Sequence, residues 1–241
     1  MNKVFFYRAN IVDYVRLVLL VGAFVAHNHP YVFFVLYALS QLMDMLDGYM
    51  ARKYDECSSF GAVLDMVLDR ASDSMIFVLL GMLYPACNAL FAFLALLDLC
   101  SHWTHMFASV LGHHHHKECT NPLLRFYYQK PVLALLCAGN EGCWLSLYLL
   151  HWAPHMFSGA ATLARFLLCV CAPLAAFKQV ISIVQWFDAC DHLGIIDLQQ
   201  REARSQESDP SSSSSTPAAN PSCNNSSSES TLTQRRNENS A

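Results

Sequence analysis

Four aspartates in the first third of the chain have the residue type and spacing of a metal site. Asp44 and Asp47 are three residues apart, and Asp65 and Asp69 are four apart. On a helix, residues at these spacings project from one face, one turn above the other. Hard divalent cations prefer carboxylate oxygens, and two facing pairs provide enough of them to hold two ions with bridging carboxylates. The stretch therefore predicts metal ligands for two Mg²⁺ or Mn²⁺ ions at Asp44, Asp47, Asp65 and Asp69.

The residues between the two pairs suit the same site. Gly48 permits close approach of a backbone or a ligand, and Arg52 adds a fixed cation beside the acids. The polar bend at residues 55–59 lets the second helix fold back antiparallel to the first. We therefore expect the two carboxylate pairs to face each other across two helices.

Apolar runs flank these acids on both sides. YVFFVLYALSQLM precedes them and SMIFVLLGMLYPA follows them. A carboxylate near the centre of a membrane-spanning helix costs roughly 2.5 to 3.5 kcal/mol, so four that faced lipid would cost on the order of 10 kcal/mol. In a soluble protein, ordinary surface acids or salt-bridge partners would be the favoured interpretation. In a membrane the acids must face protein, water or metal, which favours a functional site.

The composition indicates a polytopic membrane protein with a polar end. Of the 241 residues, 54% are hydrophobic and 14% are charged, and the mean hydropathy is +0.27. An interfacial segment is expected at residues 1–10. We expect an all-α fold with six transmembrane helices, at about 11–26, 31–51, 60–83, 89–111, 132–152 and 160–186.

The distribution of basic residues predicts the orientation of the chain. HNHP, YPACNA and HWAPHMFSG, three short connections, contain no Lys or Arg, whereas the opposite ends of the spans carry most of them. The positive-inside rule places both termini and the acid cluster in the cytosol. Residues 199–241 are rich in Ser, Asn, Glu and Pro and cannot bury enough apolar surface to fold. The chain is thus expected to comprise a membrane domain, 1–198, and a disordered cytosolic tail, 199–241.

Charge, cysteine and histidine patterns argue against other functions. The net charge of −4 provides no basic face for nucleic acid. The ten cysteines form no C-x-x-C pair, and several lie within apolar runs, so we expect reduced thiols rather than disulfides or a zinc site. Adjacent imidazoles at 113–116 cannot all converge from one helix, which favours a solvated loop over a metal site.

The acid region also contains a longer pattern of fixed spacing. It reads D-x-x-D-G-x-x-A-R and, eight residues later, G-x-x-x-D-x-x-x-D. The residues that form it are Asp44, Asp47, Gly48, Ala51, Arg52, Gly61, Asp65 and Asp69. This pattern resembles the signature of the CDP-alcohol phosphatidyltransferases, and the resemblance covers about 6–178. LCSHWTHMFASV, NPLLRFYY and LCAGNE further along resemble the eukaryotic phosphatidylinositol synthase branch of that family.

The resemblance implies a reaction and roles for the acid region. The donor would be CDP-diacylglycerol, with its diphosphate on the metal ions, its acyl chains in the bilayer and CMP as the leaving group. An attacking alcohol must lose its proton, and the resemblance gives the role of general base to Asp69, which is also a metal ligand. The positions that it assigns to binding CDP-diacylglycerol are Gly48, Ala51, Arg52, Ser58 and Gly61.

The acceptor alcohol follows from the resemblance alone. The branch implies myo-inositol, and polar groups that could bind it are Asn121, Arg125 and Lys130 in the long polar loop, with Asn140 and Glu141 in the fifth span. Other acceptors remain open: glycerol 3-phosphate, serine, or choline or ethanolamine with a different donor. An ion-coupled transporter is a weaker alternative, because the acids cluster at one membrane face. The resemblance also implies a homodimer in endoplasmic reticulum or Golgi membranes.

Overall fold

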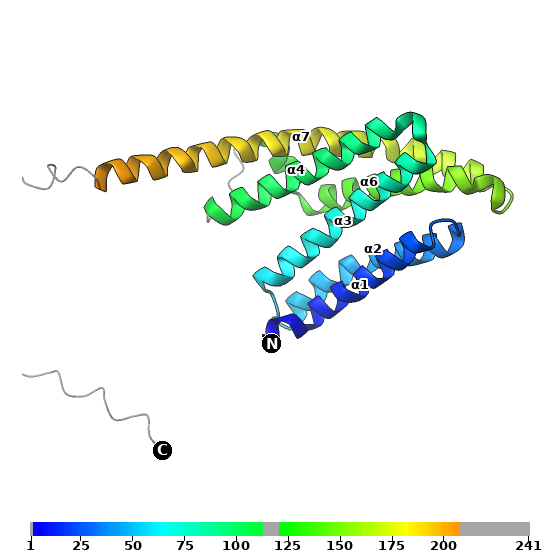
Figure 1. The fold of residues 1–241 in the computed structure, drawn as a ribbon, viewed down its shortest axis with the longest axis horizontal. Helices are drawn as coiled ribbons and strands as arrows, with labels where there is room; N and C mark the ends of the chain where they lie inside the picture. The colour runs from blue at the N-terminus through cyan, green and yellow to red at the C-terminus, as the bar shows by residue number, and fades with distance from the viewer. Residues whose placement is uncertain (1, 113–120, 208–241) are drawn as a thin grey trace, which may run out of the picture. The chain divides into compact units, whose positions relative to one another are not determined.

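The structure is a computed structural model that describes residues 2–112 and 121–207. Within these residues it contains helices and no strand, which confirms the all-α fold class. The elements shown in Figure 1 are η1 (Lys3–Phe6), α1 (Arg8–Val25), α2 (Pro30–Lys53), α3 (Ser59–Leu83), η2 (Pro85–Cys87), α4 (Asn88–Gly112), α5 (Pro122–Tyr127), α6 (Lys130–Trp152), η4 (Ala153–His155) and α7 (Ala160–Glu207). The six predicted helical segments correspond to α1, α2, α3, α4, α6 and α7.

Local sequence explains where the helices begin. The side chain of Ser58 caps α3 by accepting a hydrogen bond from the Gly61 N–H at 3.0 Å. Asn121 caps α5 in the same way, and proline occupies the first turn of α2, α5 and α6. Between α2 and α3 the chain turns at Asp55, whose φ of 54° lies in the left-handed region that Asp tolerates. This bend turns the chain so that α3 packs on α1 and side chains of α2 and α3 meet, as at Gln41 and Ser72.

The helices pack so that α3 lies at the centre of the acid-bearing half. Helix α1 packs on α2, and α3 packs on α1, α4 and α6 (Figure 1). Away from the acids, aromatic side chains join these helices. The Phe33 ring lies 4.1 Å from the Tyr148 ring and 5.5 Å from the Tyr37 ring. Because all three side chains are buried, α2 and α6 share one apolar core.

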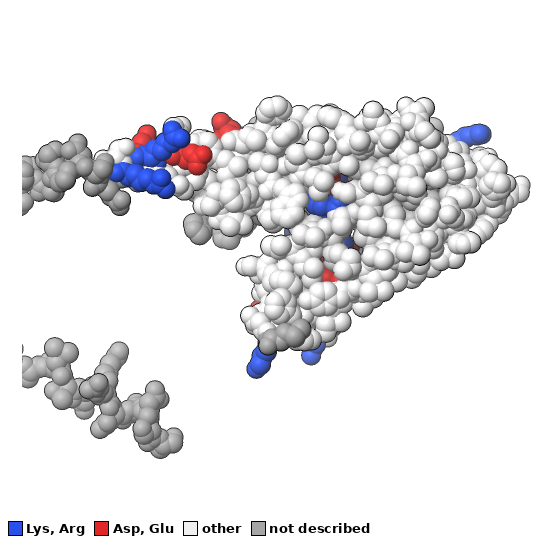
Figure 2. Space-filling view, viewed as in Figure 1, with Lys and Arg blue, Asp and Glu red and all other residues white. Residues whose placement is uncertain are grey.

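Three described helical segments are long and apolar enough to cross a membrane. They are Pro85–Leu111, Lys130–His155 and Ala160–Glu202. Helices α1, α2 and α3 carry the charged residues of the acid site, which lower their hydropathy. Figure 2 shows an outer surface that is uncharged along the middle of the helices, and charged atoms there appear only inside a hollow. The chain thus has the character of an integral membrane protein.

Helix α7 is longer than the predicted span. It continues through Pro173 as far as Glu207. Contacts divide the chain into two units, Met1–Gln199 and Gln200–Ala241. Residues 199–207 of the predicted tail are therefore helical, because Gln, Arg, Glu and Ala favour helix and no Gly or Pro interrupts them. The rest of that tail, 208–241, and the histidines at 113–116 lie outside the described residues.

Candidate active site

A single guanidinium lies among acidic side chains from three helices. Arg16 of α1 is 3% exposed, and its two terminal nitrogens contact carboxylate oxygens at 2.6 to 3.1 Å. The carboxylates belong to Asp13, Asp44, Asp47, Asp65 and Asp69. Five carboxyl groups surround one guanidinium and outnumber it, so this group has ligands for further cations. We call these six residues the acid site.

Helix geometry explains why the carboxylates converge. The last turns of α2 and the first turns of α3 each present two aspartates on the faces that meet. Asp13 and Arg16 are three apart on α1 and pair at 3.1 Å, so both point toward α2 and α3. The structure therefore brings together the four aspartates that the sequence predicts, and it adds Asp13. The acid pattern of the sequence includes neither Asp13 nor Arg16.

The donor set of the acid site suits a hard divalent cation. Carboxylate oxygens within 4.8 Å of one another form two groups, one of Asp13, Asp47 and Asp65 and one of Asp44, Asp65 and Asp69. Every donor in the two groups is a carboxylate oxygen, the type of ligand that Mg²⁺ and Mn²⁺ prefer. Asp65 belongs to both groups. These residues therefore fit divalent metal.

Gly48 and Arg52 lie together at the end of α2. A Cβ atom on Gly48 would be 3.3 Å from Nη1 of Arg52, so the guanidinium lies directly over the glycine. In the following bend, the Ala51 carbonyl accepts a hydrogen bond from the Glu56 N–H at 2.9 Å. The Glu56 carboxylate accepts one from the N–H of Arg8 at 2.7 Å. These contacts fix the bend and tie it to the start of α1.

Gly61 allows a buried side chain to pack against the start of α3. A Cβ atom there would lie 2.8 Å from Oδ1 of Asn10 and 3.2 Å from Oγ of Ser58. Asn10 is 1% exposed, and its amide donates to the carbonyl of Val4 at 2.7 Å. Gly61 is thus required by the close approach of Asn10, a residue that the sequence pattern did not single out. This contact joins η1, α1 and α3.

A second charged group lies beside the acid site, between α3, α4 and α7. Nη1 of Arg70 contacts Asp98 at 2.6 Å and Asp73 at 3.0 Å, and Nζ of Lys178 lies 3.7 Å from Asp73. Nη2 of Arg70 also lies 3.8 Å from Asp69. Asp73 continues the face of α3 that carries Asp69, and it forms an ion pair with Arg70.

The predicted acceptor residues of the polar loop lie apart from the acid site. The Asn121 side chain accepts from the Leu123 N–H at 3.0 Å, in its role as helix cap. Arg125 and Lys130 are exposed. Among the described residues, none of these three side chains contacts the carboxylates of the acid site. Their role in binding the acceptor stays a prediction.

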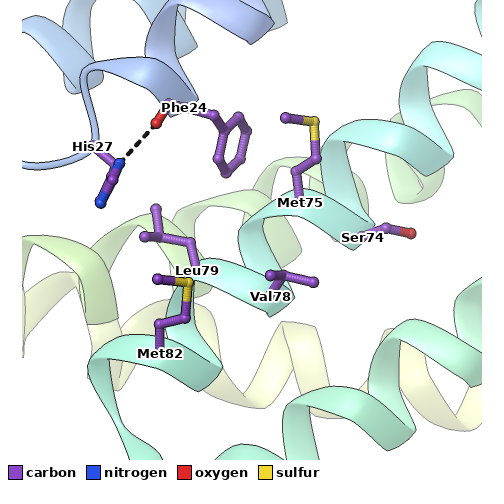
Figure 3. Close-up of a pocket in the computed structure, with 7 residues that line it drawn as sticks. All are labelled: Phe24, His27, Ser74, Met75, Val78, Leu79 and Met82. Atoms are coloured by element: carbon purple, nitrogen blue, oxygen red, sulfur yellow. Dashed lines mark hydrogen bonds between the residues drawn. The ribbon is translucent and has the colours of Figure 1, made fainter.

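An apolar pocket of about 360 Å³ lies farther along α3. Figure 3 shows its lining: Phe24, His27, Ser74, Met75, Val78, Leu79 and Met82. Most of these residues project from α3, and α1 contributes Phe24. The residues that line it include no Asp or Glu to bind a cation and no Lys or Arg to bind a diphosphate. The chemistry belongs to the acid site.

Comparison with known proteins places the chain in a family. Residues 6–189 match the family model of the CDP-alcohol phosphatidyltransferases. The chain belongs to this family. Its membership confirms the resemblance carried by the acid pattern, and members of the family in general depend on a divalent metal.

Curated relatives include several enzymes named CDP-diacylglycerol--inositol 3-phosphatidyltransferase. The Homo sapiens enzyme is 36% identical over 206 residues, covering 83% of this chain and 97% of its own. The Saccharomyces cerevisiae enzyme is 40% identical over 190 residues, covering 76% and 84%. The Drosophila melanogaster enzyme is 34% identical over 211 residues, covering 87% and 94%. No solved structure gives a significant match.

Proposed function

We propose that this protein transfers the phosphatidyl group of CDP-diacylglycerol to myo-inositol, giving phosphatidylinositol and CMP. The observation that carries the proposal is its similarity to enzymes of that name from animals and yeast along most of the chain. The convergence of five carboxylates supports the same conclusion, because the reaction moves a diphosphate ester that needs cations for binding.

The metal-binding part of the proposal assigns two divalent ions, Mg²⁺ or Mn²⁺, to Asp44, Asp47, Asp65 and Asp69. Two overlapping groups of donors that share Asp65 support two positions. When bound, the ions neutralise the diphosphate and stabilise the charge that develops as CMP leaves. Asp13 lies in one of these groups and is a further ligand in this proposal.

The nucleotide-binding part rests on the end of α2 and the start of α3. Arg52 binds the donor through its planar, permanently charged guanidinium. Gly48 lets the Arg52 guanidinium lie close to the backbone of α2, since a Cβ atom at Gly48 would be 3.3 Å from its Nη1. Ala51, Ser58 and Gly61 complete this surface in the proposal: Ala51 fixes the bend, and Ser58 and Gly61 shape the first turn of α3.

Asp69 acts as the general base in this mechanism. Its carboxylate accepts a hydrogen bond from Nη2 of Arg16 at 2.8 Å, and Nη2 of Arg70 lies 3.8 Å away, so two cations orient it. As the inositol oxygen bonds to the lipid-side phosphorus, its proton passes to Asp69 and the bond from that phosphorus to the CMP oxygen breaks. The electron pair of that bond leaves with CMP.

The membrane arrangement is also a proposal. Six spans would be formed by α1, α2, α3, α4, α6 and α7, with η1 at the interface and both termini and the acid site in the cytosol. The membrane domain would be 1–198, the tail 199–241, the assembly a homodimer, and the location the endoplasmic reticulum or Golgi. Removing residues 208–241 should leave CMP release unchanged; loss of activity would mean that the tail belongs to the enzyme.

Release of CMP by the detergent-purified protein tests the reaction. The protein is given CDP-diacylglycerol and Mg²⁺ or Mn²⁺ with myo-inositol, serine, glycerol 3-phosphate or no acceptor. Release that depends on myo-inositol is the expected result. Release driven by another alcohol would replace the acceptor. Absence of release with every acceptor and either metal, in protein shown to be folded, would contradict the reaction.

A further inference from the structure

Polar side chains are joined by a series of hydrogen bonds that leads from beside the acid site into the helix bundle. Nε2 of Gln41 donates to Oγ of Ser72 at 2.8 Å, and this hydroxyl donates to Oη of Tyr37 at 3.3 Å. Oη of Tyr37 donates to Oε2 of Glu141 at 2.7 Å. Gln41 lies one turn from the carboxylates of α2, and Ser72 lies one turn from those of α3. This series of hydrogen bonds therefore begins directly beside the acid site.

The same series of hydrogen bonds continues from α6 to α7. Nδ2 of Asn140 lies 3.5 Å from Oε1 of Glu141, and Nε2 of Gln179 donates to Oδ1 of Asn140 at 3.2 Å. Oε1 of Gln179 is buried and has no hydrogen-bond partner among the described residues. Glu141 and Gln179 keep partial exposure, whereas Asn140 is 1% exposed. Asn140 thus links the Glu141 carboxyl group to Gln179, whose amide oxygen is unpaired among the described residues.

Placing these hydrogen-bonded polar side chains within the helix bundle costs free energy, and binding metal at the acid site does not explain why they are there. Buried amide, hydroxyl and carboxylate groups within helices of a membrane protein are expensive and mark functional positions. Among the side chains joined by these hydrogen bonds, from Gln41 to Gln179, none caps a helix and none contacts the carboxylates of the acid site. An apolar core that includes Phe33 and Tyr148 lies immediately beyond them. A ligand that supplies hydroxyl groups would satisfy the unpaired oxygen.

The charged groups beside these hydrogen-bonded side chains indicate what kind of acceptor could bind to them. The cations nearest to them are Arg70 and Lys178, and both lie against Asp73, while Arg70 also contacts Asp98. Among the described residues, the two cations beside these groups are therefore paired with carboxylates, and neither is free to bind an acceptor phosphate. A neutral polyol suits these side chains because each hydroxyl both donates and accepts, and Glu141 accepts through two oxygens.

We propose that this series of hydrogen-bonded side chains is the acceptor subsite and that Glu141 and Gln179 bind hydroxyl groups of a neutral polyol. We call it the polyol chain, and it consists of Gln41, Ser72, Tyr37, Glu141, Asn140 and Gln179. The proposal rests on the proposed function and assigns the binding of inositol to helices rather than to the polar loop. Ser72 of the subsite lies one turn from Asp69 on α3, which places that end of the subsite beside the proposed general base.

The substitution Glu141→Gln tests the subsite because it replaces one carboxyl oxygen by an amide nitrogen and keeps the shape. We expect the KM for myo-inositol to rise about 3- to 10-fold, since the variant presents an amide N–H where the enzyme presents an oxygen and so loses one hydrogen bond to a hydroxyl group. The KM for CDP-diacylglycerol should stay within about twofold, because the acid site is untouched. Mono-deoxy-inositols add a second readout. The analogue that lacks the hydroxyl bound by Glu141 should be penalised in the wild type and much less in the variant.

Further variants keep the test decisive. Tyr37→Phe removes only the hydroxyl that donates to Glu141, so it raises the KM for inositol even if Glu141→Gln folds poorly. Ser146→Ala removes a buried hydroxyl from the same helix that bonds only to its own backbone, and it should change neither KM. If Glu141→Gln and Tyr37→Phe lower kcat equally for inositol and for every mono-deoxy-inositol, and the order of preference among these alcohols is unchanged, then the two side chains contribute only to helix packing. That result would overturn the proposal.

Arg125→Gln compares the subsite with the polar loop. If this variant raises the KM for inositol while Glu141→Gln does not, the acceptor binds at the loop and the polyol chain is wrong. If the wild type uses a different alcohol, the proposed function fails. The subsite is then measured with that alcohol, and an unchanged KM in Glu141→Gln overturns it separately.

Discussion

Arg16 contacts every carboxylate of the acid site and is almost fully buried, which makes it the main cation holding α1, α2 and α3 together at this end. The signature does not include it, and its sequence position indicates only that it could pair with Asp13 or reach the mouth of the site. The structure shows that it does both. One side chain thus neutralises acids that would otherwise repel one another.

Replacing Arg16 by Gln should make folding depend more strongly on divalent metal. Loss of a buried charge partner costs about 3 to 5 kcal/mol, because the acids lose their cation. The melting temperature should fall in the presence of a chelator and recover with Mg²⁺ or Mn²⁺ by more than in the wild type. Arg8→Gln is the matched control, since Arg8 is exposed on the same helix. Equal metal-induced stabilisation of both variants would contradict the role of Arg16.

Replacing Asp69 by Asn should separate binding from turnover. The variant keeps an oxygen toward the site but cannot accept the proton of the alcohol, so the rate of CMP release should fall by about 10²- to 10⁴-fold. Protection of the protein against heating by CDP-diacylglycerol should persist. Asp55→Asn removes an exposed carboxylate from the nearby bend and should leave the rate unchanged. Near-normal CMP release by Asp69→Asn would remove Asp69 from the role of base.

At the scale of elements, the start of α3 depends on a contact that no helix pattern predicts. Asn10 approaches the backbone of Gly61 so closely that any side chain there would displace it. Gly61→Ala should therefore destabilise the protein by about 1 to 3 kcal/mol. Gly194→Ala, with open space around its Cβ, should instead stabilise α7 by about 0.5 to 1 kcal/mol. Thermal unfolding measures both, and equal effects of the two changes would show that the contact is unimportant.

The helices were predictable from sequence because each combines an apolar run with a clear boundary. Pro30 and the capping Ser58, for example, begin α2 and α3 close to the predicted positions. The convergence of the four aspartates was also predictable, since their spacing fixes their helical faces. The sequence also named Asn140 and Glu141 as candidate acceptor groups. Asn10 and the hydrogen bonds that link the polyol chain across helices were not predictable, because bonds such as Tyr37–Glu141 and Gln41–Ser72 join residues 104 and 31 apart in sequence, and Asn10 packs against the backbone of another element. Such contacts depend on how helices pack, which spacing within one helix does not determine.

At the scale of the whole molecule, the number of spans depends on whether charged helices cross the membrane. Helices α1 to α3 hold most of the acid site's charge inside the bundle, so they can cross in the company of α4, α6 and α7. Two exposed cysteines test this. Cys57 lies between α2 and α3 and Cys87 lies in η2, so α3 must separate them if it spans the membrane.

In sealed microsomes, a membrane-impermeant maleimide should label a variant that retains only Cys57. It should not label a variant that retains only Cys87 until the membrane is opened with detergent. The reason is that positive-inside orientation places Cys57 in the cytosol and Cys87 in the lumen. Labelling of both variants in intact microsomes would mean that α3 does not cross. Labelling of Cys87 alone would mean that the orientation is reversed.

Asp65 is shared between the two groups of carboxylates in the acid site. Two cations that use one side chain are close neighbours and compete for the same negative charge. Their occupancies are therefore coupled, and a calorimetric isotherm should not fit two identical, independent sites. Since the donor's diphosphate adds negative charge, the second cation should bind more tightly when the lipid nucleotide is present. By linkage, the apparent metal requirement of this protein would then depend on how much CDP-diacylglycerol its membrane contains.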